Sequence, residues 1–254
     1  MSPDLALALE LADLADSISL PRFRSRDLRV ETKADTSPVT EVDRAVEDEL
    51  RQRLSRYFPG DAILGEEQGE TASGARRRWI IDPIDGTRNY VRGVPAWGTL
   101  IALEVEGRLV AGVASAPALG QRWWAARGEG AFNDRGRIEV STIHQVEDAY
   151  ISTTDYTGFA KTRGLLDRYT ALASRCWAAR GLGDLWSHAL VAEGSIDIAA
   201  EMPVSPWDIA AAKVIVEEAG GRVTDIDGRD RIDTGSVVSS NGRLHDAVIA
   251  ALRR

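Results

Sequence analysis

The stretch Trp79-Ile80-Ile81-Asp82-Pro83-Ile84-Asp85-Gly86-Thr87-Arg88-Asn89-Tyr90 organises the rest of the chain. Its first three residues form a short apolar run that predicts a buried strand. We expect this strand to stop at Asp82-Pro83, because proline cannot donate to a sheet ladder. Asp85-Gly86 is a turn signal, so two carboxylates three residues apart are expected where the chain leaves the sheet.

The chemistry that this turn offers is an all-oxygen one. Hard divalent cations bind oxygen ligands, and Asp82, Asp85 and a main-chain carbonyl between them supply these. If the amides of Gly86 and Thr87 open a helix, they form an anion site beside the cations. The stretch therefore predicts a site for metal and phosphate. The alternative is an ordinary loop of turn-forming residues, since short motifs also match by chance.

Residues 82–90, Asp-Pro-Ile-Asp-Gly-Thr-x-Asn-aromatic, resemble the signature of the inositol monophosphatase superfamily of magnesium-dependent phosphatases. The resemblance covers nearly the whole chain, from Lys33 to Gly220-Gly221. It implies a mixed α and β fold, a five-layer α-β-α-β-α sandwich, and usually a homodimer. The family's Phe after Asn is Tyr90 here, a conservative departure that leaves the metal ligands untouched.

Length and composition bound the other possibilities. The 254 residues suffice for one large domain or two closely packed halves. We place an N-terminal α+β half with most metal ligands at 1–140, and a C-terminal α/β half with Asp208 and the substrate-selecting residues at 141–254. The net charge of −8 disfavours nucleic acid as a partner. An acidic protein that handles an anionic substrate also needs a cation.

No apolar run of about 18 residues is present, so no membrane-spanning helix is expected. The N-terminus lacks a basic region followed by an uninterrupted apolar one, which argues against a signal peptide. Cys176 is the only cysteine, which excludes an intrachain disulfide and fits a reducing compartment. A cytoplasmic protein is therefore expected.

Periodicity and turn residues predict the remaining elements. A helix runs from Ser2-Pro3 to about Ser19, and an irregular arm covers 22–38. A second helix begins at Thr40, where Thr40-Glu41-Val42-Asp43 resembles a capping box. The other predicted strands are 62–65, 100–105, 109–113, 122–126, 149–152, 176–178, 196–200, 222–224 and 236–239, and the other predicted helices are 161–174, 185–193, one from 205 and one near 244–252.

Two further carboxylates match the family pattern. Gly65-Glu66-Glu67 resembles the family's Gly-Glu-Glu, whose first glutamate is a metal ligand, so Glu66 takes that role. Trp207-Asp208 resembles the late Trp-Asp at a helix start, whose aspartate completes the second metal. Taken alone, Glu66 would be a solvated strand end, and Asp208 an acidic residue favoured by the helix dipole.

The resemblance implies two or three Mg²⁺ ions per active site. Asp82 would bridge two of them, with Glu66 and the Ile84 carbonyl on one, and Asp85 and Asp208 on the other. Such a pair lowers the pKa of a bound water, orients the phosphate and stabilises the leaving alkoxide, without a phospho-enzyme.

Four more residues match family positions around these metals. The Gly86 and Thr87 amides would hold phosphate oxygens. The Thr87 hydroxyl, paired with Asp43, would position the attacking water, although Asp43 also reads as a plain capping-box residue. Lys33 resembles the lysine before Ser-Pro-Val that lies near the metals.

Other chemistries lack their residues. The histidines His144, His188 and His245 have no zinc spacing. Neither a Gly-x-Ser-x-Gly elbow nor a Walker loop occurs, and Cys176 lacks a nucleophile context. The seven tryptophans are interpreted as core or interface residues.

Within the superfamily, Arg180-Gly181-Leu182-Gly183-Asp184 followed by Ser187 looks most like histidinol-phosphate phosphatases. Asp184 and Glu201 could pair with a substrate ammonium, which histidinol phosphate has and inositol phosphate lacks. Asp184 could equally cap the helix that follows, and Glu201 has a counterpart in inositol-cleaving relatives.

The sequence therefore predicts a Mg²⁺-dependent phosphomonoesterase that hydrolyses L-histidinol phosphate in histidine biosynthesis. The first alternative is an inositol-1-phosphatase or a broad small-molecule phosphatase. A catalytically silent metal-binding scaffold is the alternative from another class.

Overall fold

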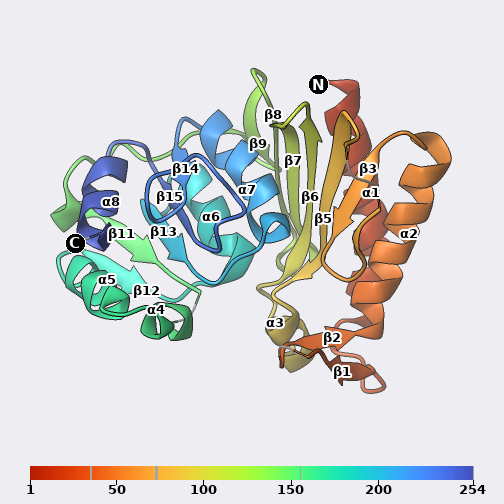
Figure 1. Ribbon diagram of the computed structural model, residues 1–254, viewed down its shortest axis with the longest axis horizontal. Coiled ribbons are helices and arrows are strands. Elements are labelled where there is room, and N and C mark those ends of the chain that lie inside the picture. The colour runs from red at the N-terminus through yellow and green to blue at the C-terminus, as the bar shows by residue number, and fades with distance from the viewer. Residues whose placement is uncertain (35, 72–73, 155, 254) are drawn as a thin grey trace.

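Five layers of secondary structure, α-β-α-β-α, make up the protein (Figure 1). The computed structural model describes residues 1–34, 36–71, 74–154 and 156–253. Three clusters of buried apolar side chains hold the layers together. The predicted five-layer sandwich is confirmed.

The first layer contains α1 (Pro3–Ser19) and α2 (Glu41–Tyr57), which pack against one face of the large sheet (Figure 1). α2 begins with the predicted capping box. The Thr40 hydroxyl accepts a hydrogen bond from the backbone N–H of Asp43, and the Asp43 carboxylate accepts one from the backbone N–H of Thr40. Val42, Val46, Leu50 and Leu54 repeat every four residues and are all buried. The helix therefore covers the sheet with one continuous apolar stripe.

The second layer is an eight-stranded sheet with the order β10-β9-β8-β7-β6-β5-β3-β4. Its strands are β3 (Ala62–Gly65), β4 (Gly69–Glu70), β5 (Arg77–Asp85), β6 (Gly98–Val105), β7 (Arg108–Ala116), β8 (Gln121–Ala126), β9 (Gly130–Asn133) and β10 (Gly136–Ile138). Trp79 and Ile81 of β5 pack toward α1 and α2, whereas Ile80 packs toward the middle layer. Because both faces of the sheet are covered here, residues 79–81 of β5 form a continuous apolar run.

The middle layer contains α6 (Asp184–Ala192) and α7 (Pro206–Glu218), which lie between the two sheets (Figure 1). The second sheet has the order β12-β11-β13-β15-β14. Its strands are β11 (Tyr150–Ser152), β12 (Ala178–Arg180), β13 (Ile198–Glu201), β14 (Arg222–Thr224) and β15 (Val237–Ser240). The outer layer consists of α4 (Thr157–Lys161), α5 (Leu165–Ala173) and α8 (His245–Arg253).

Strand β5 corrects one prediction from the sequence. It does not stop at Asp82-Pro83 but continues to Asp85, which pairs with Gly98 of β6. The register shifts between Asp82 and Asp85, so Pro83 stands in a bulge where the ladder does not require its missing N–H. The short helix α3 (Thr87–Arg92) follows at once.

The arm predicted as irregular also contains regular structure. Residues 30–32 form β1 (Val30–Thr32), which pairs antiparallel with β2 (Pro38–Thr40). Asp35, which falls between these strands in sequence, lies outside the described residues. The burial of β1 is low, so its sequence shows no apolar alternation from which it could be predicted.

Two boundaries in the second half also differ. The helix predicted at 161–174 divides into α4 and α5 at Gly164, whose φ of +69° leaves the helical region. The strand predicted at 176–178 lies at 178–180 instead, because backbone hydrogen bonds from Arg175 and Cys176 to Leu172 and Ala173 extend the end of α5.

Short 3₁₀ segments at Leu20–Arg22, Pro117–Leu119 and Val146–Asp148 complete the described structure. No helix in the described ranges has the length and apolar character needed to cross a membrane. The strands of the eight-stranded sheet lie within residues 62–138, and those of the five-stranded sheet lie within residues 150–240. The division at 140/141 stays a prediction, which this separation of the sheets supports.

Candidate active site

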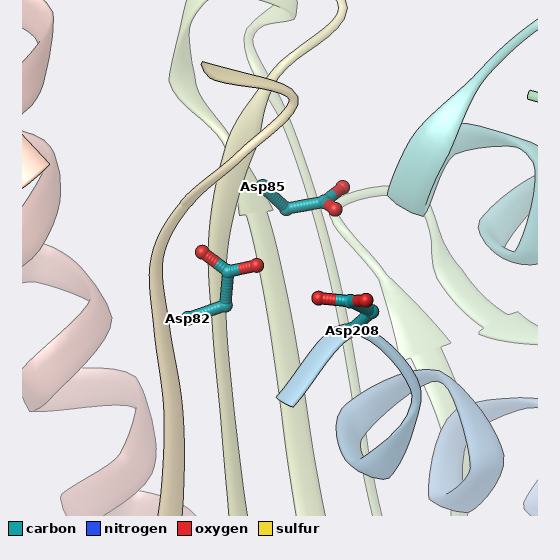
Figure 2. Close-up of side chains that lie close together, drawn as sticks. All are labelled: Asp82, Asp85 and Asp208. Atoms are coloured by element: carbon teal, nitrogen blue, oxygen red, sulfur yellow. The ribbon is translucent and has the colours of Figure 1, made fainter. Parts of the chain in front are cut away.

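Three carboxylates converge where β5 ends against the start of α7 (Figure 2). Asp82 and Asp85 come from the last residues of β5, and Asp208 comes from the first turn of α7. Each offers one oxygen, and these oxygens all lie within 4.8 Å of one another. Residues 126 positions apart in sequence therefore form one acidic cluster, the Asp82–Asp85–Asp208 triad.

The bulge in β5 explains how both of its aspartates reach this point. On a regular strand, residues three apart face opposite sides of the sheet. The register shift between Asp82 and Asp85 removes that alternation. The Pro83 carbonyl accepts a hydrogen bond from the Thr99 hydroxyl at 2.8 Å, which fixes the bulge against β6.

The triad is electrostatically unfavourable by itself. Burial raises the pKa of Asp82 and of Asp85 well above the usual range, and the neighbouring carboxylates raise both further. Burial also raises the pKa of Asp208 to about 7. The hydrogen bond from the Ser205 backbone N–H lowers this pKa, and repulsion from Glu66 and Glu201 offsets part of that lowering. Oδ1 of Asp82 is buried and has no hydrogen-bond partner among the described residues.

These features fit a divalent cation. The donors are carboxylate oxygens only, the set that Mg²⁺ prefers over softer metals. A cation among the three carboxylates would relieve their repulsion and satisfy the orphaned oxygen of Asp82. The residues present can therefore hold a metal ion.

Glu66 lies close to the triad but outside it. Its charge raises the pKa of Asp82 and of Asp208, yet Oε1 accepts a hydrogen bond from Lys33 Nζ at 2.7 Å. Lys33 also donates to Glu67 at 2.6 Å. Burial acts to lower the pKa of Lys33, but these two glutamates raise it overall, so the ammonium is retained. The predicted role of Glu66 as a metal ligand stays a prediction.

A buried glutamate of α2 holds the Glu66 loop in place. Glu47 accepts from the backbone N–H groups of Glu67 and Gln68 at 2.8 and 3.0 Å, and its charge is balanced by Arg51 at 2.8 Å. A Cβ on Gly65 would lie 2.3 Å from Glu47 Oε1. Glycine at 65 is therefore required for Glu47 to approach this closely.

The start of α3 lies beside the triad, as predicted. Gly86 is the N-cap with a φ of +80°, and a Cβ there would lie 3.0 Å from an Asp184 oxygen and 3.1 Å from the Ala96 carbonyl. The Thr87 hydroxyl lies 3.2 Å from Asp43 Oδ1 and 3.0 Å from the Ile84 carbonyl. Since a hydroxyl has one hydrogen, Thr87 donates to one of these acceptors at a time.

An open cleft of about 530 Å³ lies next to these residues. Its walls come from both halves of the chain: Ser37, Pro38, Glu66, Gly86, Thr87, Arg88, Asn89, Val94, Ala96, Thr154, Gly181, Leu182, Gly183, Asp184 and Trp186. Its size suits a small phosphate ester.

Asp184 lies on the wall of this cleft. Its Oδ2 accepts a hydrogen bond from Asn89 Nδ2 at 3.0 Å, and its backbone N–H donates to Thr154 Oγ1 at 2.9 Å. The alternative that Asp184 caps the following helix is wrong, because Gly183 is the N-cap and Asp184 lies in the first turn. The carboxylate that meets this helix end is Asp85, which accepts from Leu185 N at 2.6 Å.

Glu201 differs from Asp184 in its surroundings. It ends β13, is buried, and does not belong to the residues that line the cleft. Its charge nevertheless raises the pKa of both Asp85 and Asp208, so it lies near the triad. Its Oε2 lies 3.5 Å from His188 Nε2.

Sequence reasoning assigned no role to Asn89, Trp186 or His188. Asn89 lies inside the signature stretch, and its amide holds both Asp184 and the Ala96 carbonyl, at 3.0 and 2.7 Å. Trp186 lines the cleft, although the tryptophans were interpreted as core or interface residues. Trp186 lies two residues after Asp184 on a helix, a spacing at which side chains do not face each other, so neither Trp186 nor His188 had a signal in the sequence.

Comparison with known proteins supports one family. The profile of the inositol monophosphatase family matches residues 1–254. A histidinol-phosphatase of Mycobacterium tuberculosis is 50% identical to this chain, over 98% of this chain and 97% of its own. One of Streptomyces coelicolor is 47% identical, over 99% and 97%.

A solved structure agrees with these sequence relatives. The inositol monophosphatase of Thermotoga maritima superposes with a TM-score of 0.89 at 32% identity, over 99% of this chain and 97% of its own. Fold, acidic triad and sequence relatives thus lead to the same group of proteins. The chain belongs to the inositol monophosphatase family.

Proposed function

We propose that the protein is a Mg²⁺-dependent phosphomonoesterase that releases phosphate from L-histidinol phosphate in histidine biosynthesis. The observation that carries the proposal is the Asp82–Asp85–Asp208 triad, two buried carboxylates and one partly buried one beside a cleft of about 530 Å³. The two relatives named histidinol-phosphatase support the choice of substrate.

Asp85 and Asp208 would hold one Mg²⁺, and Glu66 and the Ile84 carbonyl would hold a second. Asp82 would contribute to both. When bound, Mg²⁺ lowers the pKa of water and neutralises charge on the phosphate and on the leaving oxygen. Because a carboxylate has two oxygens, Glu66 could bind a cation through Oε2 while Oε1 keeps the hydrogen bond from Lys33. Lys33 is also paired with Glu67.

The chain's own groups would orient the reactants. The Gly86 and Thr87 amides at the start of α3 would donate to phosphate oxygens. The Thr87 hydroxyl donates to Asp43 or Ile84, and its oxygen can accept a hydrogen bond from the attacking water. Asp43 is 0% exposed and is also held by the Thr40 backbone N–H at 2.9 Å, so this arrangement is rigid.

The cleft offers a carboxylate for the substrate ammonium. Asp184 accepts from Asn89 through one oxygen, which fixes its side chain next to Gly86. Ammonium and carboxylate form charge-assisted hydrogen bonds, which are stronger than neutral ones. Inositol phosphate has hydroxyls only and would gain less.

A phosphate-release assay tests the proposal. Histidinol phosphate and inositol-1-phosphate should be compared with the purified protein, with Mg²⁺ and with excess EDTA. We expect Mg²⁺-dependent turnover with the higher kcat/KM on histidinol phosphate. Preference for inositol-1-phosphate would overturn the substrate, and no turnover of any ester would favour a catalytically silent metal-binding scaffold.

Asp184→Asn should affect the amine-bearing substrate selectively. The amide keeps the shape and the contact distance to Asn89 but loses the negative charge, so we expect kcat/KM for histidinol phosphate to fall about 10- to 100-fold. The kcat/KM for inositol-1-phosphate should change less than about threefold. Equal losses on both substrates would show that Asp184 does not bind the ammonium.

We further propose a cytoplasmic homodimer without nucleic-acid or membrane partners. The net charge of −8 supports the exclusion of nucleic acid. Trp177 is 74% exposed next to β12, an edge strand of the second sheet, and offers an apolar contact for a second copy. Sedimentation equilibrium should give twice the chain mass of 27.6 kDa, and a monomer mass would contradict this.

A further inference from the structure

A buried histidine and a buried glutamate face each other behind the active site. His188 of α6 is 1% exposed and Glu201 of β13 is 7% exposed. His188 Nε2 and Glu201 Oε2 are 3.5 Å apart without a hydrogen bond, so Nε2 and the other carboxylate oxygen, Oε1, both lack a hydrogen-bond partner among the described residues. An unpartnered carboxylate oxygen in the interior calls for a ligand or water.

The proton positions around His188 follow from its two neighbours. The ring nitrogen that faces the Glu201 carboxylate is Nε2, so in the tautomer that carries its hydrogen there the N–H points at an acceptor. In a neutral imidazole, Nδ1 is then the acceptor. Ser239 Oγ lies 2.8 Å from Nδ1 and can donate to it. Ser239 is thus hydrogen-bonded to His188, and the Glu201 carboxylate lies 3.5 Å beyond the other ring nitrogen without a hydrogen bond to it.

The Glu201 carboxylate lies close enough to the triad for its charge to act on Asp85 and Asp208. It projects from the end of β13, and Glu201 pairs with Val237 of β15, two residues from Ser239. The helix that carries His188 also carries Asp184 on the cleft wall. One helix therefore joins the cleft to the Glu201 carboxylate.

We propose that His188 is a positioning residue for the substrate. Nε2 faces Oε2 of Glu201 at 3.5 Å, backed by the Ser239 hydroxyl, and this contact turns Oε1 toward an N–H donor of the substrate. His188 itself touches neither the metals nor the phosphate in this role. The inference rests on the proposed function, because it takes Glu201 as a group that binds the ester's leaving alcohol.

A double-mutant cycle tests this coupling. The variants are His188→Phe, Glu201→Gln and the two combined, each assayed with Mg²⁺ on histidinol phosphate. Phenylalanine keeps a ring of similar shape but removes Nε2–H. We expect KM to rise about 10-fold in His188→Phe, with kcat changed less than about threefold, because binding of the leaving alcohol is lost rather than the chemistry.

The combined variant separates positioning from folding. If His188 acts through Glu201, then adding His188→Phe to Glu201→Gln should leave KM within about twofold of the Glu201→Gln value. A further multiplicative rise would overturn the proposal. So would a His188→Phe enzyme with wild-type KM. In Ser239→Ala, Nδ1 loses its donor, and we expect a KM rise in the same direction but smaller.

A second buried histidine provides the matched control. His245 is 0% exposed and lies between Thr224 and Ser240 hydroxyls, at 2.8 and 2.9 Å, in the outer layers of the second half. His245→Phe should lower the melting temperature as much as His188→Phe does, but leave KM unchanged. If both variants raise KM equally, the effect of His188 is structural.

The assay also distinguishes failure of the inference from failure of the proposed function. If wild type does not turn over histidinol phosphate but does hydrolyse another ester, the substrate assignment fails, and the cycle is repeated on that ester. If wild type prefers histidinol phosphate and the cycle is additive, only the role of His188 fails.

Discussion

Asp82→Asn is expected to reduce Mg²⁺-dependent phosphate release about a thousandfold or more, which corresponds to about 4 kcal/mol of lost transition-state stabilisation. The substitution keeps the size of the side chain and removes one charge. Burial raises the pKa of Asp82, and the charges of Glu66, Asp85, Asp208 and Asp43 raise it further, so Asp82 interacts with the whole acidic group. Loss of its charge therefore weakens every cation bound there.

The same variant should be more stable than wild type when no metal is present. Burial and four like charges oppose ionisation of Asp82, and asparagine removes that repulsion. We expect a higher melting temperature in EDTA at pH 8. Asp167→Asn, on the exposed face of α5, is the matched control and should change neither activity nor stability measurably. An Asp82→Asn enzyme with more than about a tenth of wild-type activity would contradict the account.

The second large effect is the coupling of Mg²⁺, pH and stability. Burial raises the pKa of Asp208 from its usual 3.8 to about 7 in the folded metal-free protein, and burial also raises the pKa values of Asp82 and Asp85. Between these limits the folded state binds more protons than the unfolded state. Stability of the metal-free protein must therefore fall as pH rises from about 4 through about 7.

Added Mg²⁺ should reverse this trend. A ligand at about 100 times its Kd stabilises the folded state by about 2.7 kcal/mol, which is roughly 5 to 10 °C for a chain of this length. We expect the Mg²⁺-induced rise in melting temperature to be larger at pH 8 than at pH 5.5, because protons compete with the cation for the same oxygens. Thermal scans at both pH values, with Asp208→Asn as the control, measure it. An equal rise at both pH values would show that Mg²⁺ binds elsewhere.

The predicted family and fold class and the phosphatase reaction are confirmed by the comparisons and the structure. The family and the fold class could be predicted because the motifs that indicate them are formed by residues close together in sequence. The capping box of α2, the apolar stripe from Val42 to Leu54 and the turn at Asp85-Gly86 each lie within one element and depend on short-range geometry.

What the sequence could not predict depends on contacts between distant residues. Pro83 inside a strand contradicts strand rules unless a bulge is present, and that bulge is held by Thr99 of the next strand. Asp184 is a residue type that favours an N-cap, but Gly183 is the N-cap, and Asp85, 100 positions away in sequence, accepts from the Leu185 backbone N–H in the first turn. The pairing of Lys33 with Glu66 likewise joins residues 33 positions apart.

His188 marks the limit of sequence reasoning. Its partners Ser239 and Glu201 lie on different strands of the second sheet, and no spacing on α6 distinguishes it from an ordinary core histidine. Such a residue becomes visible only when unpaired polar atoms in the interior are compared.

The most direct test of the account is where divalent ions bind. Crystals grown with Mn²⁺ in place of Mg²⁺, measured at a wavelength where manganese scatters anomalously, would locate each ion. We predict anomalous peaks in coordination contact with the carboxylates of Asp82, Asp85 and Asp208. Peaks only at other carboxylates, with the triad free of manganese, would contradict the claim that these three residues form the metal centre.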